Sequence, residues 1–268
     1  MSNAIRLEVQ KKCAGLDIPL VGFAPAGRWD EPLFEPWVPE AFRPRAIFPE
    51  TKTVIVIGLP VSLPIVESAP SIWYHELYRT VNTLLDQAGY RIAAALTAEG
   101  YPSVWIPRDG YGSVSVLVER PVAFFSHRHA ALLAGLGNFG TNNMLLTPEF
   151  GPRVRFASIL SSAEIAPDPV LEKPLCIRCQ RCVRACPVHA LDGGDYPRGL
   201  TDKKTCATRS EALLKRSISP CGICIKVCPV GEDRKGFSRE DTEIYDEDNP
   251  IFDRYHRAWN HVRSYGGW

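Results

Sequence analysis

The cysteines carry the clearest chemical pattern in this chain of 268 residues, because eight of the nine lie within about a fifth of it. A first run reads C-x2-C-x2-C-x3-C-P, a second reads C-x2-C-x3-C-P, and one more cysteine lies between them. This pattern is typical of [4Fe-4S] clusters, because three closely spaced thiolates can bind three irons of one cube. The eight residues are Cys176, Cys179, Cys182, Cys186, Cys206, Cys221, Cys224 and Cys228.

The two runs predict two clusters of the bacterial ferredoxin type, with ligands exchanged between the runs. We expect the last cysteine of each run to lie on the following helix and to point away from its own loop. The ligands of one cluster are then Cys176, Cys179, Cys182 and Cys228, and those of the other are Cys186, Cys206, Cys221 and Cys224. The ninth, Cys13, is expected to be a small buried hydrophobe without a role.

A pair of structural zinc sites is the alternative for eight cysteines, since zinc also accepts four thiolates at C-x2-C spacing. Zinc ribbons lack both the third cysteine two residues on and the proline after the last one, so the pattern favours iron. A disulfide scaffold is not expected in a cytoplasmic chain, where thiols stay reduced.

Charge and hydrophobicity indicate a soluble, cytoplasmic protein. The formal net charge is +1 and Lys and Arg are spread along the chain, so no basic stripe indicates nucleic-acid binding. The first ten residues do not resemble a secretion signal. The longest apolar stretch, residues 53–66, is interrupted by Pro60 and Pro64 and is too short to cross a membrane.

The uneven distribution of cysteine predicts a domain of residues 1–168, a cysteine module of 169–235 and a C-terminal tail of 236–268 that packs on the core. Apolar periodicity predicts an α/β or α+β sandwich of three layers. The expected helices are 3–14, 72–99 and 127–136, and the expected strands are 18–23, 53–59, 103–106, 113–118 and 154–160. The tail shows no clear period.

Gly135, Gly137 and Gly140 match the dinucleotide-binding pattern G-x-G-x-x-G. We reject that interpretation, because the glycines follow a helix rather than a strand and no acidic residue lies about 20 positions later. A tight loop whose bare backbone approaches a large ligand is the expectation that remains.

The stretch AGLGNFGTNNMLLTPEFG (134–151), followed by a strand, a proline-rich linker and the eight cysteines, resembles epoxyqueuosine reductases and reductive dehalogenases. The resemblance implies a nitroreductase-like sandwich followed by a ferredoxin-like module. It also implies cobalamin bound without a protein histidine on cobalt. The expected cobalamin-binding residues are Gly135, Gly137, Asn138, Gly140, Asn142 and Tyr111.

This chain departs from epoxyqueuosine reductases at three places. The glycine loop continues with Thr141 and Asn142 where that family has a basic residue. The family's proton-donating aspartate corresponds to a position near Pro121, and the nearest acid is Glu119, which becomes a candidate proton donor. The C-terminal helical-repeat domain that helps the family bind tRNA has no counterpart here, so tRNA is not the expected substrate.

His127 and His129 are further candidates for proton delivery. Both lie in the first turn of an expected helix capped by Ser126, where the helix dipole lowers the pKa of a histidine and favours the neutral ring. His127 is the first choice because it is nearer the cap, although a first-turn histidine can equally be structural. Aromatic residues that could line a pocket over a corrin, or else simply pack in the core, are Tyr74, Tyr78, Tyr111 and Trp105.

The function expected from these features is that of a cobalamin-dependent iron-sulfur reductase. An external donor such as ferredoxin or flavodoxin would supply electrons through both clusters to the corrinoid, which reduces a small substrate. The alternative is an electron-transfer or corrinoid-reducing protein without a carbon substrate of its own. A flavin in the larger domain is a third possibility.

Overall fold

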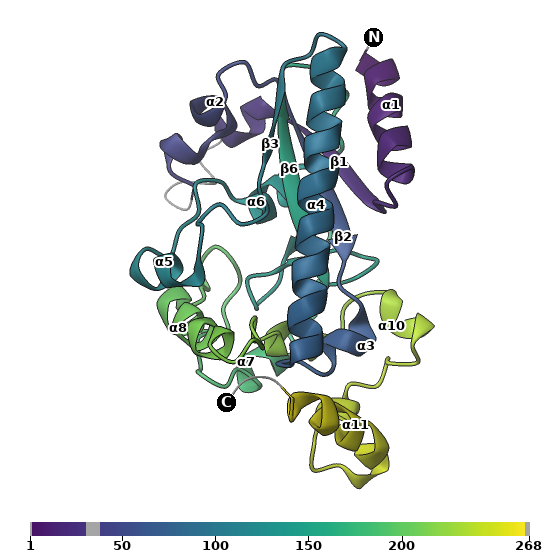
Figure 1. Ribbon diagram of the computed structural model, residues 1–268, viewed down its shortest axis with the longest axis vertical. Helices are drawn as coiled ribbons and strands as arrows, with labels where there is room; N and C mark the ends of the chain where they lie inside the picture. The colour runs from purple at the N-terminus through teal and green to yellow at the C-terminus, as the bar shows by residue number, and fades with distance from the viewer. Residues whose placement is uncertain (1, 31–37, 266–268) are drawn as a thin grey trace.

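The computed structural model describes residues 2–30 and 38–265. A four-stranded sheet lies at the centre of the larger part of the molecule (Figure 1). Its strand order is β1-β2-β6-β3, and every neighbouring pair is antiparallel. The strands are β1 (Leu20–Pro25), β2 (Thr53–Pro60), β3 (Ser103–Ile106) and β6 (Val154–Ser161).

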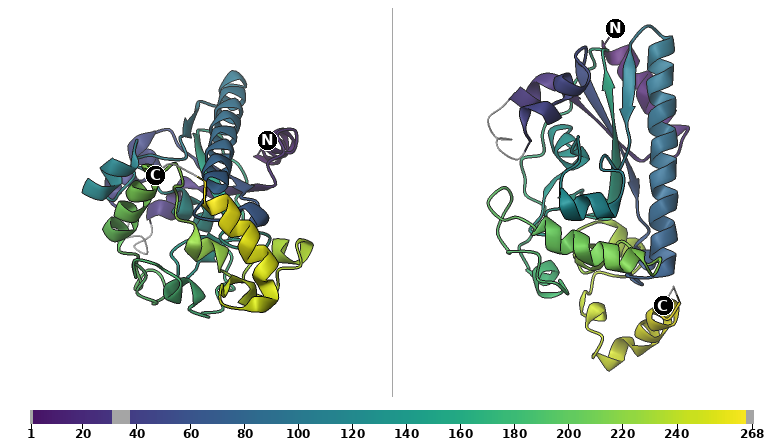
Figure 2. Two further views of the ribbon diagram at one scale, coloured as in Figure 1. Left: turned by 60° about the horizontal axis from the view of Figure 1, so that its bottom comes forward. Right: turned by 60° about the vertical axis from the view of Figure 1, so that its left-hand side comes forward.

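Helices cover both faces of the sheet, as the right-hand view of Figure 2 shows. Successive side chains of a strand point to opposite faces, so β2 contributes Ile55 and Ile57 to one core and Val54 and Val56 to the other. The first core is closed by α1 and α4, and the second by α6, α2 and the turn η1. These elements are α1 (Ser2–Ala14), η1 (Ala26–Asp30), α2 (Pro44–Ile47), α4 (Ile72–Ala98) and α6 (His127–Leu133).

The long helix α4 connects the sheet domain to the cysteine module. Its N-terminal cap is Ser71, whose hydroxyl accepts from the Tyr74 amide at 3.1 Å. Buried residues such as Leu85 and Ile92 pack on the sheet, while the first turn reaches the module at the lower end of Figure 1. There Tyr74 packs with Ile225 in a separate small core.

The remaining elements are short and surround the cysteines or connect them to the sheet. They are η3 (Glu40–Phe42), α3 (Leu63–Val66), α5 (Val114–Glu119), β4 (Asn138–Phe139), β5 (Leu145–Leu146), α7 (Arg181–Arg184), α8 (Lys203–Leu214), α9 (Ile223–Lys226), α10 (Asp233–Gly236), η4 (Glu243–Tyr245), η5 (Pro250–Phe252) and α11 (Asp253–Arg263).

The expected strand 113–118 is wrong, because this segment forms the helix α5. Its three valines favour a strand, yet Ser113 caps the helix by accepting from the Val116 amide, and α5 packs against α8. The helix expected over 127–136 ends at Leu133, since Gly135 adopts a left-handed conformation with φ of 73°. The other expected helices and strands agree with the structure to within about two residues.

The tail contains a helix that the sequence did not indicate. α11 buries His256 and Trp259, and Arg263 of its last turn pairs with Glu247 at 2.7 Å. Upstream, Arg239 pairs with the buried Glu67 at 2.8 Å. The division into 1–168, 169–235 and 236–268 stays a prediction. Within residues 2–30 and 38–265, no helix has the length and apolar character that a membrane span needs.

Candidate iron-sulfur centre

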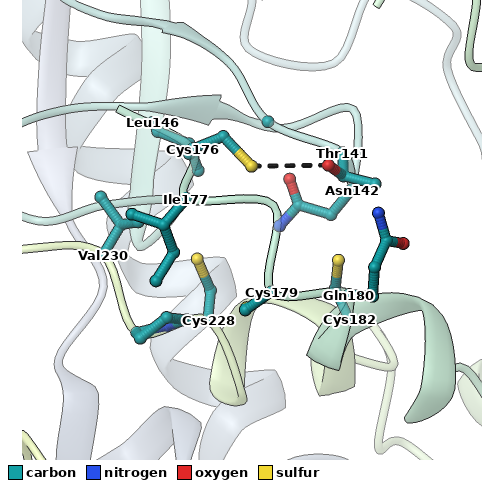
Figure 3. Close-up of a pocket in the computed structure, with 12 residues that line it drawn as sticks. Thr141, Asn142, Leu146, Cys176, Ile177, Cys179, Gln180, Cys182, Cys228 and Val230 are labelled. Carbon is teal, nitrogen blue, oxygen red and sulfur yellow. Dashed lines mark hydrogen bonds between the residues drawn. The ribbon is translucent and has the colours of Figure 1, made fainter. Parts of the chain in front are cut away.

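Four of the predicted ligands line one cavity (Figure 3). They are Cys176, Cys179, Cys182 and Cys228. Figure 3 shows the sulfurs of Cys176, Cys182 and Cys228 directed toward the same space. The cavity therefore joins three cysteines of the first run with the last cysteine of the second, which is the combination that a ligand exchange requires.

Two loops of the same shape carry the central cysteines. Gln180 and Gly222, each directly after a cysteine, have left-handed φ angles of 59° and 72°. Each starts a single helical turn, α7 or α9, whose second residue is Cys182 or Cys224. Gln180 is held in this uncommon conformation by its side-chain amide, which donates to the Gly193 carbonyl at 3.0 Å. The repetition indicates two equivalent metal-binding loops.

The sequence led us to expect the last cysteine of each run on a helix, but neither of them lies on one in the structure. Cys186 and Cys228 each follow a one-turn helix by two residues. The chain beyond Cys228 is fixed by Arg153 and Arg234, two buried guanidinium groups that both donate to the Cys228 carbonyl. Arg153 also forms a paired ion bridge with Asp233. Cys228 is thereby held against the sheet domain.

The other four predicted ligands form a second group around Cys224. Burial raises the pKa of the Cys224 thiol, and the neighbouring thiols Cys206, Cys221, Cys182 and Cys186 raise it further, so Cys182 of the first group is also nearby. The pKa of Cys206, the exposed member of the group, is also raised, by partial loss of contact with solvent and then by Cys221 and Cys186. Cys206 is contributed by α8, which begins at its cap Asp202. Four mutually close thiols thus come from three separate segments.

Both groups suit a cube better than a single ion. In the described part of the chain, no three His, Cys, Asp or Glu side chains converge as closely as one metal ion requires. A cube binds each thiolate at a different iron, so its ligands surround a cavity instead of meeting at a point. The donor set of four thiols per site and the cavity between them fit [4Fe-4S] clusters.

Protein hydrogen bonds reach the sulfurs at both groups. The Thr141 hydroxyl lies 3.4 Å from the Cys176 sulfur, as Figure 3 shows. The Ala190 amide donates to Cys186 at 3.3 Å, and the Arg209 guanidinium donates to Cys221 at 3.5 Å. Such bonds to ligand sulfurs are one of the means by which a protein sets a cluster potential.

The glycine loop packs on the protein itself. A Cβ at Gly135 would lie 2.1 Å from the Pro169 carbonyl oxygen, and one at Gly137 would lie 1.8 Å from that of Leu146. At Gly140 the obstacles are the side chains of Leu146 and Asn142. These glycines are therefore explained by close approaches within the chain, and no large ligand is needed to account for them.

The polar residues of the same loop contact the cysteine module. Asn138 donates to the Lys173 carbonyl at 2.7 Å and accepts from the Leu175 amide at 3.0 Å, next to the first cysteine. Asn142 lines the Cys176 cavity and donates to the Cys224 carbonyl at 3.4 Å. The segment that we expected at a corrinoid thus connects the sheet domain to both cysteine groups.

His127 is a buried histidine with both ring nitrogens engaged. Nε2 lies 2.9 Å from the Pro107 carbonyl and Nδ1 lies 2.9 Å from the Ser158 hydroxyl. Since a carbonyl only accepts, Nε2 carries the proton and Nδ1 accepts from Ser158. Burial lowers the pKa of His127 to about 4. This geometry favours a structural role over proton delivery.

His129 and Glu119 lie in different surroundings. His129 Nδ1 lies 2.7 Å from the Ser126 hydroxyl, and its ring contacts both Phe139 and Tyr196, which stack on each other. Burial, followed by the charge of Arg128, lowers the pKa of His129 to about 3. Glu119 is the exposed last residue of α5. The structure does not bring these two residues together.

A half-buried polar cluster in the sheet domain includes Tyr111 and residues that the sequence did not single out. Arg155 of β6 donates to Asp109 and to Asn82, each at 3.0 Å, and its guanidinium lies 4.4 Å from the centroid of the Tyr78 ring. Tyr111 donates to Asp109 at 3.0 Å. The only sequence signal for Arg155 was a charge inside an otherwise apolar strand.

This polar cluster lies next to the second cysteine group through Tyr74. The Tyr74 and Tyr78 rings meet edge to face, with centroids 6.3 Å apart. Burial raises the pKa of Tyr74, and nearby Cys224 and Cys221 contribute to that rise. Trp105, by contrast, lies partly exposed against Tyr90 on the outer side. Tyr74, Tyr78 and Tyr111 are thus brought together, and Trp105 is not.

Comparison with known proteins agrees with this arrangement. Residues 175–232 match the family described as a 4Fe-4S dicluster domain. The tetrachloroethene reductive dehalogenase of Desulfitobacterium hafniense is 28% identical over 193 residues, which cover 66% of this chain and 32% of that protein. The epoxyqueuosine reductase of Bacillus anthracis is 31% identical over 115 residues, covering 39% and 29%.

Solved structures of both kinds share the fold. A catabolic reductive dehalogenase in complex with 3-bromo-4-hydroxybenzoic acid superposes with a TM-score of 0.65 at 19% identity, over 94% of this chain and 35% of that one. Epoxyqueuosine reductase from Streptococcus thermophilus gives 0.54 at 21%, over 84% and 65%. The chain spans about a third of the length of the relatives that it matches. It has homologues among the reductive dehalogenases and the epoxyqueuosine reductases, and its fold is a mixed α/β structure with a ferredoxin-like 4Fe-4S dicluster domain.

Proposed function

We propose that this chain is an iron-sulfur oxidoreductase in which two [4Fe-4S] clusters pass single electrons toward a cobalamin-linked site that reduces a small molecule. The arrangement of the two cysteine groups carries the proposal. One group surrounds a cavity, and the other adjoins the half-buried polar cluster through Tyr74. Electrons entering at the first group would then reach the second before the polar cluster.

The proposed ligands follow the two groups. Cys176, Cys179, Cys182 and Cys228 would hold the first cluster, and Cys186, Cys206, Cys221 and Cys224 the second. Burial already disfavours free thiolates at Cys182 and Cys228, whose pKa values are raised, that of Cys228 to about 11. Iron binding would compensate that cost by supplying positive charge.

Cobalamin and a nitroreductase-like sandwich enter this proposal from the relatives, one of whose solved structures is described in terms of B12-dependent dehalogenation. Four of the six residues that we expected to bind a corrinoid are accounted for by contacts within the protein, so their role at a corrinoid stays a prediction. Gly135, Gly137, Asn138 and Asn142 all make close contacts within the protein. We therefore derive no catalytic step through a corrinoid.

Tyr111 is a better candidate than His127 or Glu119 for supplying a proton. Its hydroxyl is hydrogen-bonded to Asp109, which also pairs with Arg155. Burial raises the pKa of Tyr111, so the hydroxyl keeps its proton until a stronger base develops nearby. Arg155 supplies a positive charge that could stabilise an anion beside it.

Anaerobic purification with iron, sulfide and cobalt assays tests the proposal. About eight irons per chain, together with uptake of added cobalamin, would support it. Eight irons without any corrinoid uptake would remove cobalamin and leave the clusters, whereas stoichiometric zinc would overturn the whole proposal. Tyr111→Phe should lower turnover of a reducible substrate by about 100-fold without changing the iron content. His127→Gln should change turnover far less.

An electron-transfer protein without its own carbon substrate is the alternative. The pairing of both His127 nitrogens and the two hydrogen bonds of the Arg155 guanidinium favour it, because these groups already have partners within the protein. Turnover separates the two proposals. If reduced corrinoid or a partner protein accepts electrons at full rate while no substrate is consumed, the alternative is correct.

A further inference from the structure

Two thiols of the first cysteine group, Cys176 and Cys179, are half-buried beside an exposed apolar side chain. Ile177, between these two predicted ligands, is 68% exposed. Ile177 also lines the cavity shared by the four cysteines and lies beside Val230 (Figure 3). A partner that covers Ile177 would therefore come directly beside the first cluster.

The surrounding segment is basic. Residues 173–190 contain four Lys or Arg and no Asp or Glu, in a chain whose net charge is only +1. Lys173 and Arg184 are exposed, and the Arg178 side chain is 68% exposed. Arg178 pairs with Asp195 at 2.6 Å, but both groups face solvent, and such pairs exchange readily for another partner. The segment thus presents net positive charge around an apolar centre.

The direction of electron flow also points to this face. Within the second cysteine group, Cys224 and Cys221 lie near Tyr74, which leads to the half-buried polar cluster of the sheet domain. An external protein can approach the first group closely, and electron transfer between proteins requires short distances between redox centres. The helix α8 is a competing docking surface, because it is also basic and carries the exposed Cys206 of the second group.

We propose that the surface formed by residues 173–190 around Ile177 is the docking site of an acidic one-electron carrier protein. This inference rests on the proposed function, since it assumes that the first cysteine group holds a cluster. The carrier would lose one electron and the first cluster would gain it, with no bond made or broken. Complementary charges would speed the encounter, and Ile177 would be buried at the centre of the contact.

Anaerobic stopped-flow reduction of the clusters by a reduced plant-type [2Fe-2S] ferredoxin tests the docking site without needing a substrate. Lys173→Glu combined with Arg178→Glu should lower the second-order rate constant by about 10-fold or more at low salt and should flatten its salt dependence. Ile177→Ser should lower the rate without altering the salt dependence. Lys204→Glu combined with Lys215→Glu, two exposed changes in and directly after α8, is the matched control and should stay within about twofold.

Three controls make the outcome decisive. Reduction by dithionite and the cluster potentials, measured by redox titration, should be the same in all variants. Because Arg178 has a left-handed φ of 55°, Arg178→Asn is a second variant that suits this conformation and should lower the rate in the same direction. The docking site is overturned if the variant with Lys173→Glu and Arg178→Glu is reduced at the full rate. It is also overturned if only the variant with Lys204→Glu and Lys215→Glu is reduced more slowly. Absence of iron would instead overturn the proposed function.

Discussion

The eight thiols of the cysteine module come from short stretches between residues 176 and 228. The residues of the half-buried polar cluster come from distant elements: Tyr78 lies on α4, Asp109 in a loop and Arg155 on β6. In the module, neighbours in sequence are neighbours in the site. In the polar cluster, the partners meet only because α4 packs on the sheet. The first arrangement is therefore visible in the spacing of residues, and the second is not.

The two regions also differ in how many hydrogen-bond partners their side chains have within the protein. Arg155, Asp109 and Tyr111 satisfy one another by hydrogen bonds at 3.0 Å. The cysteines surround a cavity, and the described hydrogen bonds to their sulfurs are few and long. Thiols that line a common cavity are arranged to hold a bound group. Polar side chains that hydrogen-bond to one another contribute mainly to the stability of the fold.

Removal of cysteines in pairs gives the largest expected effect and tests the exchange of ligands between the runs. Cys182→Ser with Cys228→Ser should remove one cluster and leave about four irons per chain. Cys182→Ser with Cys224→Ser should remove both clusters, because those two residues belong to different groups. Iron analysis and electron paramagnetic resonance measure the result, with Cys13→Ala as the control that keeps all iron. Equal iron loss in the two double variants would contradict the assignment.

Arg153 tests how firmly the sheet domain holds the module. Arg153→Met leaves the carboxylate of Asp233 without its buried partner, so we expect a loss of about 3–5 kcal/mol of stability. The temperature at which the visible cluster absorbance disappears provides the measurement. Arg45→Met, which breaks an exposed pair with Asp30, should cost less than about 1 kcal/mol. Similar losses in both variants would show that Arg153 does not secure the module.

The buried neutral ring of His127 predicts a dependence of stability on pH. Because its pKa falls to about 4 from an ordinary value of 6.5, the unfolded chain binds more protons between these values. Stability should therefore decrease as the pH falls below 6.5, by about 2 kcal/mol between pH about 7.5 and about 5 from this residue alone. His127→Gln should remove that part of the decrease in anaerobic thermal unfolding. An unchanged pH dependence would mean that His127 is accessible to protons in the folded protein.

Substitution of Gly137 tests whether the glycine loop only packs on the protein or also binds a ligand. Gly137→Ala places a methyl group against the Leu146 carbonyl and should cost about 1–3 kcal/mol without any corrinoid present. Gly27→Ala meets nothing closer than 3.8 Å and should be nearly neutral. If Gly137→Ala leaves thermal unfolding unchanged and lowers only cobalamin uptake, the loop is a corrinoid-binding element after all.

The sequence by itself determined the cysteine chemistry, the long helix α4 and the strands β2, β3 and β6. These depend on local spacing and on periodicity of apolar residues, which are properties of neighbouring positions. The sequence also indicated that residues 134–151 are important, but it did not indicate which residues they contact. It missed α11, whose buried aromatic positions are too few to reveal a period, and it misassigned α5, whose valines resemble a strand.

Only the tertiary structure decided which polar groups meet. His127 differs little in the sequence from a catalytic histidine, yet the Pro107 carbonyl and the Ser158 hydroxyl occupy both of its nitrogens. Arg155 is a single charge in a strand, yet packing surrounds it with Tyr78, Asn82 and Asp109. The burial and the partners of a side chain depend on residues far away in the sequence, and these conditions separate a structural residue from a functional one.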